Sequence, residues 1–391
     1  MKRRPNLALP AVLLLARATA PAPAQAPAST APASPPPAAI APEKWVLDGG
    51  ELTSVASRNG QAWSWGSGAG GALGDGKSAD RGQPRPLADL KNARSVAEGR
   101  AFGVAARTDG TVVEWGLEHG AWDKGGVPAR LTPHAVHGLS NVESVAAGES
   151  FAVALRRDGN AWSWGSNNAG QLGDGGNLDR TEPAPVKSSG ALKAIACGAQ
   201  HALGLRMNGS VVAWGKNVDG QLGDGTNDDR STPVDIKGLS GIRAVAAGWN
   251  WSLALDNTGR VWGWGSSLTS VVPAGEGEPP LATEPRLIAG LEGITAIAAG
   301  NWHALALKKD GTVLAWGNNG TAQLGSDGPT TSKPRPVQGL SEVALIACGS
   351  WHCLALKTDG TLWAWGNNAT GQLGDGSKET RAAPVPVPFA G

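Results

Sequence analysis

The sequence has no tyrosine and only three phenylalanines, yet it holds seventeen tryptophans among its 391 residues. Cysteine and methionine are also scarce, with three and two residues. Three cysteines form at most one disulfide, which excludes a fold that depends on a disulfide framework. Such one-sided use of a single aromatic residue is typical of one short pattern copied many times.

Long hydrophobic runs are also missing, because no apolar stretch approaches the roughly twenty residues of a membrane-spanning helix. Residues 7–16 form a short apolar stretch between a basic start and the small residues that end in Ala24-Gln25-Ala26. This order is that of a secretory signal, so we expect residues 1–26 to be removed on export to the periplasm or the extracellular space. A disordered cytoplasmic tail is the alternative interpretation of the same residues.

Basic runs are absent from the rest of the chain. Residues 27–44 are rich in alanine and proline, which predicts an extended, disordered linker. Removal of the signal would change the formal net charge from +1 to −3. A mildly acidic body is a poor match for nucleic acid, because phosphate contacts supply most of that affinity. We therefore expect neither a nucleic-acid partner nor a membrane span.

One feature recurs through residues 45–391, a Trp-Gly dipeptide spaced by about fifty residues. Seven copies of this length fill the region, so the sequence predicts seven structural repeats. The tryptophans of these dipeptides are Trp65, Trp115, Trp164, Trp214, Trp264, Trp316 and Trp365.

Each repeat contains four short strand patterns. In one copy, IRAVAAG (242–248) and SLAL (252–255) come first, and a turn ending in Thr-Gly leads to RVWGWG. Six of the seven turns end in Asn-Gly or Asp-Gly, which is a strong hairpin signal. A glycine-rich loop such as GQLGDG and a P-x-x-V segment follow. The sequence therefore predicts an all-β, seven-bladed β-propeller of four-stranded blades.

The two ends of the repeat region suggest how the ring closes. The first copy shows no P-x-x-V segment of its own, whereas the last copy ends with APVPVPF (383–389). We predict that this C-terminal strand completes the first blade, which would leave no open sheet edge there.

Most of the repeated aromatic and imidazole side chains are expected to have structural roles. The Trp-Gly tryptophans are predicted to fill the space between blades, and tryptophans two residues earlier are expected to pack on the same strand face. Histidines close the loop after the first strand in three copies, and we interpret them as structural groups bonded to backbone carbonyls. The earlier tryptophans are Trp63, Trp162, Trp262 and Trp363, and the histidines are His201, His303 and His352.

The repeats resemble those of the regulator of chromosome condensation family. The shared features are VAAG-x-x-H-x-L-A-L, x-D-G-x-V-x-x-W-G and N-x-x-G-Q-L-G-D-G, and the resemblance covers residues 45–391. It implies a seven-bladed propeller but not one function, because the family includes exchange factors for a small GTPase, a plant light sensor and secreted bacterial inhibitors of β-lactamases. The expected export and the blade number match the secreted bacterial members best.

The loop after the first strand varies between copies, and its first two positions should form a ring on one face. Blades five to seven place tryptophans there, and exposed aromatic clusters often mark binding surfaces. We predict a partner-binding face for a protein or a cell-wall-associated partner, although the same tryptophans would alternatively plug the central channel. The predicted partner-binding residues are Arg100, Glu149, Gln200, Trp249, Asn250, Asn301, Trp302, Ser350 and Trp351.

Catalytic signals are not evident: we find no nucleophile with a base, no paired carboxylates at a fixed spacing and no metal-ligand cluster. We therefore expect a non-catalytic, monomeric interaction module without a metal or cofactor. Irregular loops at 116–138 and 265–286 are further functional candidates, and Cys348 and Cys353 could form a cross-strand disulfide. Alternative functions are a lyase or hydrolase acting in the channel, or a cytoplasmic GTPase exchange factor or signalling scaffold.

Overall fold

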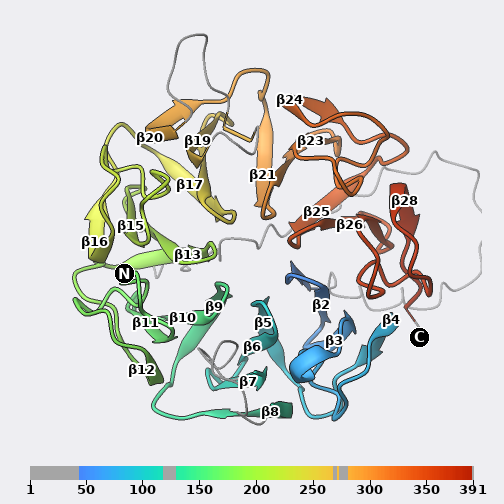
Figure 1. The fold of residues 1–391 in the computed structure, drawn as a ribbon, viewed down its shortest axis with the longest axis horizontal. Helices are drawn as coiled ribbons and strands as arrows, with labels where there is room; N and C mark the ends of the chain where they lie inside the picture. The colour runs from blue at the N-terminus through green and yellow to red at the C-terminus, as the bar shows by residue number, and fades with distance from the viewer. Residues whose placement is uncertain (1–43, 118–128, 267–270, 273–280, 390–391) are drawn as a thin grey trace, which may run out of the picture.

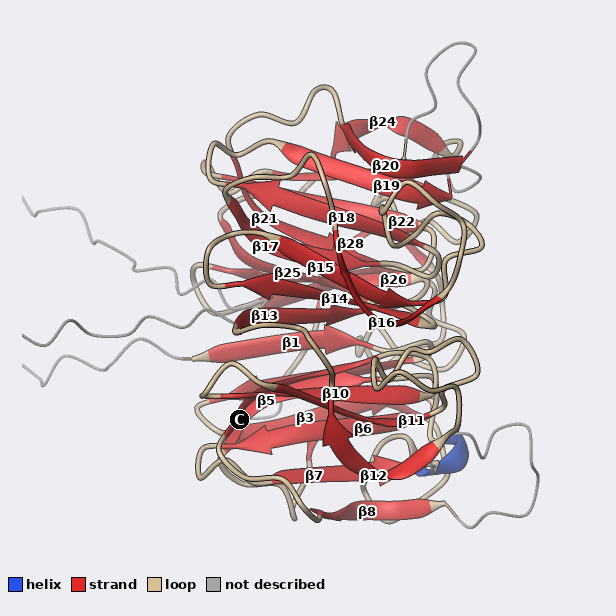
Figure 2. Ribbon diagram, turned by 90° about the vertical axis from the view of Figure 1, so that its left-hand side faces the viewer, coloured by secondary structure: helices blue, strands red, loops and turns tan. Residues whose placement is uncertain are grey.

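The computed structural model is a ring of seven four-stranded antiparallel sheets around a central channel (Figure 1). It describes residues 44–117, 129–266, 271–272 and 281–389. The expected signal (1–26) and most of the expected linker (27–44) lie outside the described residues. Seen from the side, the strands run between the two faces of a disc (Figure 2). The predicted fold class is confirmed.

Each blade consists of four consecutive strands, the first of which borders the channel. The first three blades contain β1 (Trp45–Gly49), β2 (Thr53–Arg58), β3 (Gln61–Gly66), β4 (Arg81–Pro86), β5 (Ala93–Glu98), β6 (Phe102–Arg107), β7 (Val112–Gly116), β8 (Arg130–Val136), β9 (Val142–Ala147), β10 (Phe151–Arg156), β11 (Ala161–Gly165) and β12 (Arg180–Pro185). The next two blades contain β13 (Leu192–Cys197), β14 (His201–Arg206), β15 (Val211–Gly215), β16 (Arg230–Asp235), β17 (Ile242–Ala247), β18 (Trp251–Asp256), β19 (Val261–Ser266) and β20 (Leu281–Leu287). The last two contain β21 (Ile294–Ala299), β22 (His303–Lys308), β23 (Val313–Gly317), β24 (Thr331–Pro336), β25 (Val343–Cys348), β26 (His352–Lys357), β27 (Leu362–Gly366) and β28 (Arg381–Pro386). A single 3-10 turn, η1 (Ala69–Gly71), interrupts the loop after β3.

Small residues and one tryptophan per blade allow the sheets to pack face to face. All seven Trp-Gly tryptophans are at most 1% exposed, as predicted. The indole of Trp214, for example, donates from Nε1 to the carbonyl of Gln171 in the preceding blade at 2.9 Å. Trp164 differs, because the loop that follows β7 lacks the repeated GQLGDG motif. Its indole donates instead to the Glu114 carboxylate at 2.9 Å.

The glycine-rich loops have the structural role that their sequence suggests. Leu222 is fully buried between blades. Asp224 accepts hydrogen bonds from the backbone of Thr226 at 3.0 Å and from the Arg230 guanidinium at 2.8 Å. These bonds hold the loop against the fourth strand of the same blade.

Three of the earlier tryptophans of the third strand, Trp63, Trp262 and Trp363, pack against the core, as predicted. Trp162, Trp262 and Trp363 are half-buried, and Arg156, Arg260 and Lys357 respectively lie 5.6–5.8 Å from their ring centres. A cation beside the π face covers the ring where no neighbouring blade does.

The predicted ring closure is wrong. The first blade has its own fourth strand, β4, which pairs with β3, and β28 pairs with β27 within the seventh blade. The P-x-x-V pattern was not recognised in the first copy because Leu87 replaces the valine. The backbone of Leu87 donates to Ala62, just as that of Val387 donates to Leu362 in the seventh blade.

Side chains close the ring instead of a shared sheet. The phenyl ring of Phe389, which follows β28, makes edge-to-face contacts with Trp45, Trp63 and Trp65 of the first blade at 5.5–5.9 Å between ring centres. Backbone bonds from Ser350 to Gly50 and from Gly376 to Gly82 also join the two blades.

Candidate functional site

The loops that follow the innermost strands surround one mouth of the channel, and backbone bonds join them from the second blade to the seventh. The first loop residue of one blade donates its backbone N–H to the corresponding carbonyl of the next blade. Such bonds join Arg100 to Glu149, Glu149 to Ala199, Ala199 to Trp249, Trp249 to Asn301 and Asn301 to Ser350 at 2.9–3.4 Å. The loop tips are therefore fixed relative to one another by backbone geometry, which makes them a rigid platform.

Three predicted tryptophans form one aromatic row on this platform. The Trp249 and Trp302 rings are stacked, with centres 6.3 Å apart and planes inclined by 24°. Trp351 continues the row, 6.3 Å from Trp302 and inclined by 33°. All three are half-buried, so part of each indole faces solvent. We call Trp249, Trp302 and Trp351 the aromatic row.

The other predicted partner-binding residues lie beside the aromatic row or on the opposite side of the ring of loops. Asn250, half-buried, donates from Nδ2 to Asp219 at 2.9 Å, and the Asn301 carbonyl accepts from the Trp251 indole at 2.8 Å. Ser350 is 7% exposed, so its side chain offers little surface to a partner. Gln200 is half-buried in the fourth blade.

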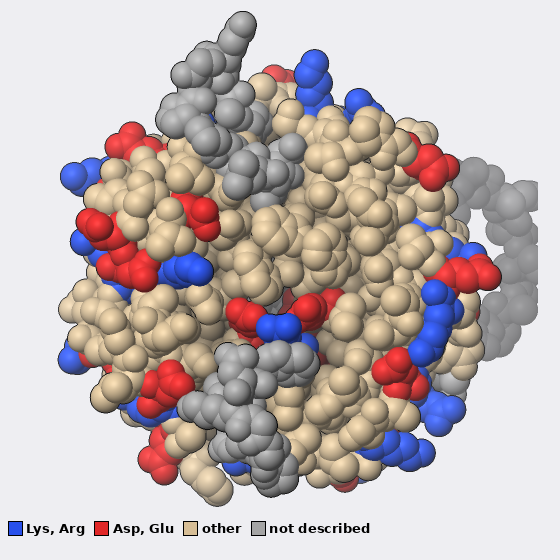
Figure 3. All heavy atoms as spheres, in the orientation of Figure 1, with Lys and Arg blue, Asp and Glu red and all other residues tan. Residues whose placement is uncertain are grey.

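Charged residues form the opposite half of the mouth. Arg100 pairs with Glu51 at 3.0 Å and with Glu149 at 2.8 Å. Acidic and basic side chains border the central hollow in Figure 3. Burial raises the pKa of Glu51, and Arg100 only partly opposes this effect. The mouth is thus aromatic over blades five to seven and charged over blades one to three.

The loop alignment of the first blade requires a correction. Gly50 donates to the Thr53 carbonyl, as Gly349 donates to that of His352, so Gly50 corresponds to the glycine that follows each innermost strand. The first two loop residues of this blade are therefore Glu51 and Leu52. They lie one position later than they would if Gly50 were aligned with the first loop residue of the other copies. This shift explains why Glu51, which was not among the predicted residues, pairs with Arg100.

The channel contains two acids that our sequence analysis missed, a buried Glu98 and a half-buried Asp48. Asp48 accepts a hydrogen bond from the Glu98 backbone at 2.9 Å, and Thr53 donates to the Glu98 carboxylate at 3.2 Å. Burial raises the pKa of Asp48 to about 7, and it raises that of Glu98 well above its ordinary value, with Asp48 adding to the effect. Neither acid was among the predicted site residues. A signal was present in the sequence, because Glu98 replaces the alanine, cysteine or glycine of the other copies.

These acids line a cavity of about 200 Å³ within the channel. Trp249, Cys197 and Cys348 line it as well. The cavity is therefore lined by two carboxyl groups whose protonated forms are favoured by burial.

The three repeat histidines bridge neighbouring blades, but not through backbone carbonyls as we expected. Nε2 of His352 lies 2.7 Å from the Ser54 hydroxyl, and Nε2 of His201 lies 3.0 Å from that of Ser252. Ser54 donates its hydroxyl proton to the backbone carbonyl of Gln372, and Ser252 donates to that of Gln221, both at 2.9 Å. Each acceptor belongs to the preceding blade. The imidazole Nε2–H must therefore be the donor to the hydroxyl.

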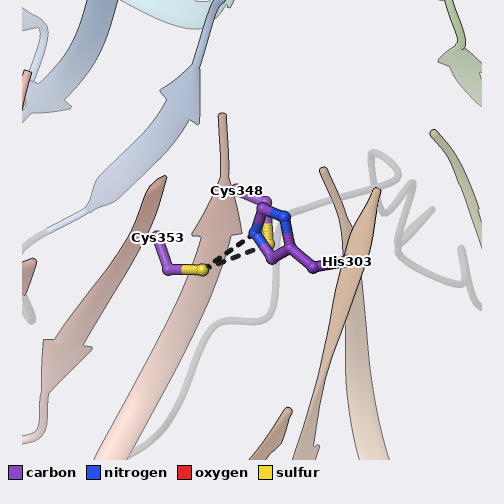
Figure 4. A group of neighbouring side chains, drawn as sticks. All are labelled: His303, Cys348 and Cys353. Atoms are coloured by element: carbon purple, nitrogen blue, oxygen red, sulfur yellow. Dashed lines mark hydrogen bonds between the residues drawn. The ribbon is translucent and has the colours of Figure 1, made fainter. Parts of the chain in front are cut away.

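The third histidine meets a thiol instead of a hydroxyl. Nε2 of His303 is 3.0 Å from the Cys353 sulfur, which lies 3.9 Å from the Cys348 sulfur (Figure 4). Burial raises the pKa of Cys348, but the Cys353 thiol and His303 lower it overall to about 6. All three cysteines are free thiols, so the proposed cross-strand disulfide is not formed.

The two irregular loops at 116–138 and 265–286, our further functional candidates, are described only in part. Residues 118–128, 267–270 and 273–280 of the two irregular loops lie outside the described residues. No helix in the described ranges is long and apolar enough to cross a membrane.

Seven four-stranded antiparallel blades in a ring define the class of seven-bladed β-propellers. The RCC1-like domain model matches residues 23–271, and the regulator of chromosome condensation (RCC1) repeat model matches 310–356 and 359–391. A second model of this repeat matches 294–323 and 343–372. The chain belongs to the RCC1 repeat family.

Similarity to individual proteins is limited in sequence and extensive in structure. A 54-residue segment is 48% identical to the mitochondrial RCC1 domain-containing protein RUG3 of Arabidopsis thaliana, covering 13% of this chain and 12% of that protein. Human WBSCR16 is 25% identical, with a TM-score of 0.75 over 85% of this chain and 95% of its own. Yeast RCC1 (Prp20), solved bound to Kap60, is 20% identical, with a TM-score of 0.73 over 88% of this chain and 85% of its own.

Proposed function

We propose that the protein is an exported, non-catalytic interaction module that binds a protein partner through the aromatic row. The observation that carries this proposal is the row itself: three tryptophans from three blades stack side by side and keep part of each ring in solvent.

The position of the row supports binding rather than packing alone. The blade cores already contain their own fully buried tryptophans. The aromatic row lies instead at loop tips that backbone bonds hold in place. A pre-organised aromatic surface loses little conformational entropy on binding, which favours affinity.

The charged half of the mouth would determine orientation. The pairs that Arg100 makes with Glu51 and Glu149 lie beside the aromatic half, so a partner with both an apolar and a polar surface would match it. Electrostatic complementarity mainly sets specificity and the rate of association.

Affinity capture tests this proposal, with the full chain as bait and an extract of the organism that makes it. The test variant replaces Trp249, Trp302 and Trp351 by alanine. The control variant replaces three half-buried tryptophans that lie on the third strands of their blades, Trp162, Trp262 and Trp363. Thermal melting confirms that both variants are folded.

We expect a partner that the unmodified bait and the control retain, and that the test variant loses by at least about tenfold. Equal retention by the test variant would refute a site at the aromatic row. If no bait retains a protein, a protein partner is excluded and a glycan becomes the better candidate.

Nucleotide exchange on a small GTPase is a second candidate, favoured by the resemblance in fold to Prp20p, which is described with its binding to Gsp1p and histones. The expected result would be faster release of labelled GDP from a small GTPase, with Gsp1p as the first choice, in the presence of the full chain. An unchanged release rate at saturating protein would exclude this function.

A further inference from the structure

We propose that His303, Cys348 and Cys353 form a binding site for one thiophilic metal ion, Zn(II) or Cu(I), between the sixth and seventh blades. The three donor atoms lie within 4.8 Å of one another. His303 begins β22, Cys348 ends β25 and Cys353 lies at the start of β26, so two neighbouring blades supply the ligands (Figure 4).

The distances match those of a shared metal. Two thiolates on one tetrahedral zinc lie about 3.8 Å apart, because each Zn–S bond is about 2.3 Å. The two sulfurs lie 3.9 Å apart, and the imidazole nitrogen is 3.0 Å from one of them. Small side-chain rotations would therefore place all three atoms around one ion.

Comparison between blades shows that the site results from two separate replacements. Cys353 occupies the position of Ser252 and Ser54, which bond to histidines in the equivalent way. Cys348 lies directly opposite Cys353 in the strand pair, where Ala247 lies opposite Ser252. Only at this blade interface, among the described residues, do two cysteines and a histidine converge.

The chemistry of the donors favours a soft ion. Thiolate and imidazole ligands select zinc and Cu(I) over magnesium and calcium, which prefer oxygen. Two thiolates and a neutral imidazole would balance the charge of a divalent ion in a buried site. His303 and Cys353 are fully buried, and Cys348 is 6% exposed.

Binding requires a defined movement of protons. Both thiols release their protons to solvent as the metal–sulfur bonds form. The imidazole proton moves from Nε2 to Nδ1, which frees Nε2 to coordinate. No oxidation or reduction takes place. Cys348 lines the channel cavity, so an ion can reach the site from the channel.

The test is metal titration of the reduced, metal-free full chain. Zn(II), and Cu(I) under anaerobic conditions, are titrated separately in competition with a coloured chelator. Two variants remove one ligand each while restoring the residue of sister blades, Cys353→Ser and Cys348→Ala. Cys197→Ala is the matched control, because that cysteine has an alanine opposite it.

We expect one equivalent of at least one ion, with the two variants weaker by at least about 100-fold and the control unchanged. Free thiols should fall from three to one on binding. The stronger-bound ion identifies the natural ligand chemistry.

Two results would overturn the proposal. One is binding of neither ion, or equal binding by all variants. The other is the loss of two thiols without metal and their recovery only by a reductant, which would make the pair a redox disulfide instead.

Discussion

Buried ionisable side chains distinguish individual blades that otherwise share one pattern. Burial lowers the pKa of His201 and of His352 to about 3, and it raises that of Asp48 to about 7. The histidines are neutral in the folded protein, so their contribution to stability is present above their ordinary pKa and is lost as the pH falls towards 3. Asp48 has the opposite effect, because its contribution is full below its ordinary pKa and is lost as the pH rises through 7.

The Asp48→Asn variant isolates the contribution of Asp48 to the pH dependence of stability. Asparagine keeps an acceptor for the Glu98 backbone but does not titrate. Between pH 5 and 7, the free energy of unfolding of the unmodified protein should fall relative to the variant by about 1.4 kcal/mol per pH unit. Urea unfolding at several pH values measures this difference. Parallel pH profiles for the two proteins would show that Asp48 is ionised in the folded state.

At the scale of the element, two tryptophan positions that lie two residues apart on the third strand have different environments. Trp214 on β15 is fully enclosed and bonded to the neighbouring blade. Trp162 on β11 faces outwards beneath Arg156.

Trp214→Ala should therefore cost far more stability than Trp162→Ala. The first change leaves a large cavity between blades, and similar substitutions cost about 3–5 kcal/mol. The second removes a half-exposed ring and a cation–π contact, with an expected cost of about 1 kcal/mol. Chemical denaturation of both variants gives the comparison. If the two variants lost similar free energy of unfolding, the conclusion that Trp214 belongs to the inter-blade core and Trp162 does not would be wrong.

At the scale of the whole molecule, the first and seventh blades meet without a shared sheet. Ser54 and His352 bond across this interface at 2.7 Å, and the Thr370 hydroxyl donates to the Leu52 carbonyl at 3.0 Å. Phe389 adds an aromatic contact from the end of the described chain. Closure therefore depends on side-chain contacts and backbone bonds, like those that join the fourth and fifth blades.

Phe389→Ala should weaken this closure. Loss of three edge-to-face contacts should reduce the free energy of unfolding by about 1–3 kcal/mol. Leu178→Ala serves as the control, because Leu178 is 84% exposed. Thermal melting and limited proteolysis near β1 are the measurements. Equal behaviour of both variants would mean that Phe389 does not contribute to closure.

The sequence by itself determined the repeat, the four strands of the later blades, the first three strands of the first blade and the burial of the Trp-Gly tryptophans. These features depend on local periodicity and turn chemistry, which recur in every copy and so reinforce one another. It also indicated Trp249, Trp302 and Trp351 as residues that depart from the repeat.

Only the tertiary structure decided which of these departures meet in space. The stacking of the aromatic row, the proximity of Asp48 and Glu98, and the convergence of His303 with two cysteines all join residues of different blades. Such contacts depend on how one blade is placed against the next. Ring closure was mispredicted for a related reason, since Leu87 performs the packing role of valine although the local pattern does not reveal it.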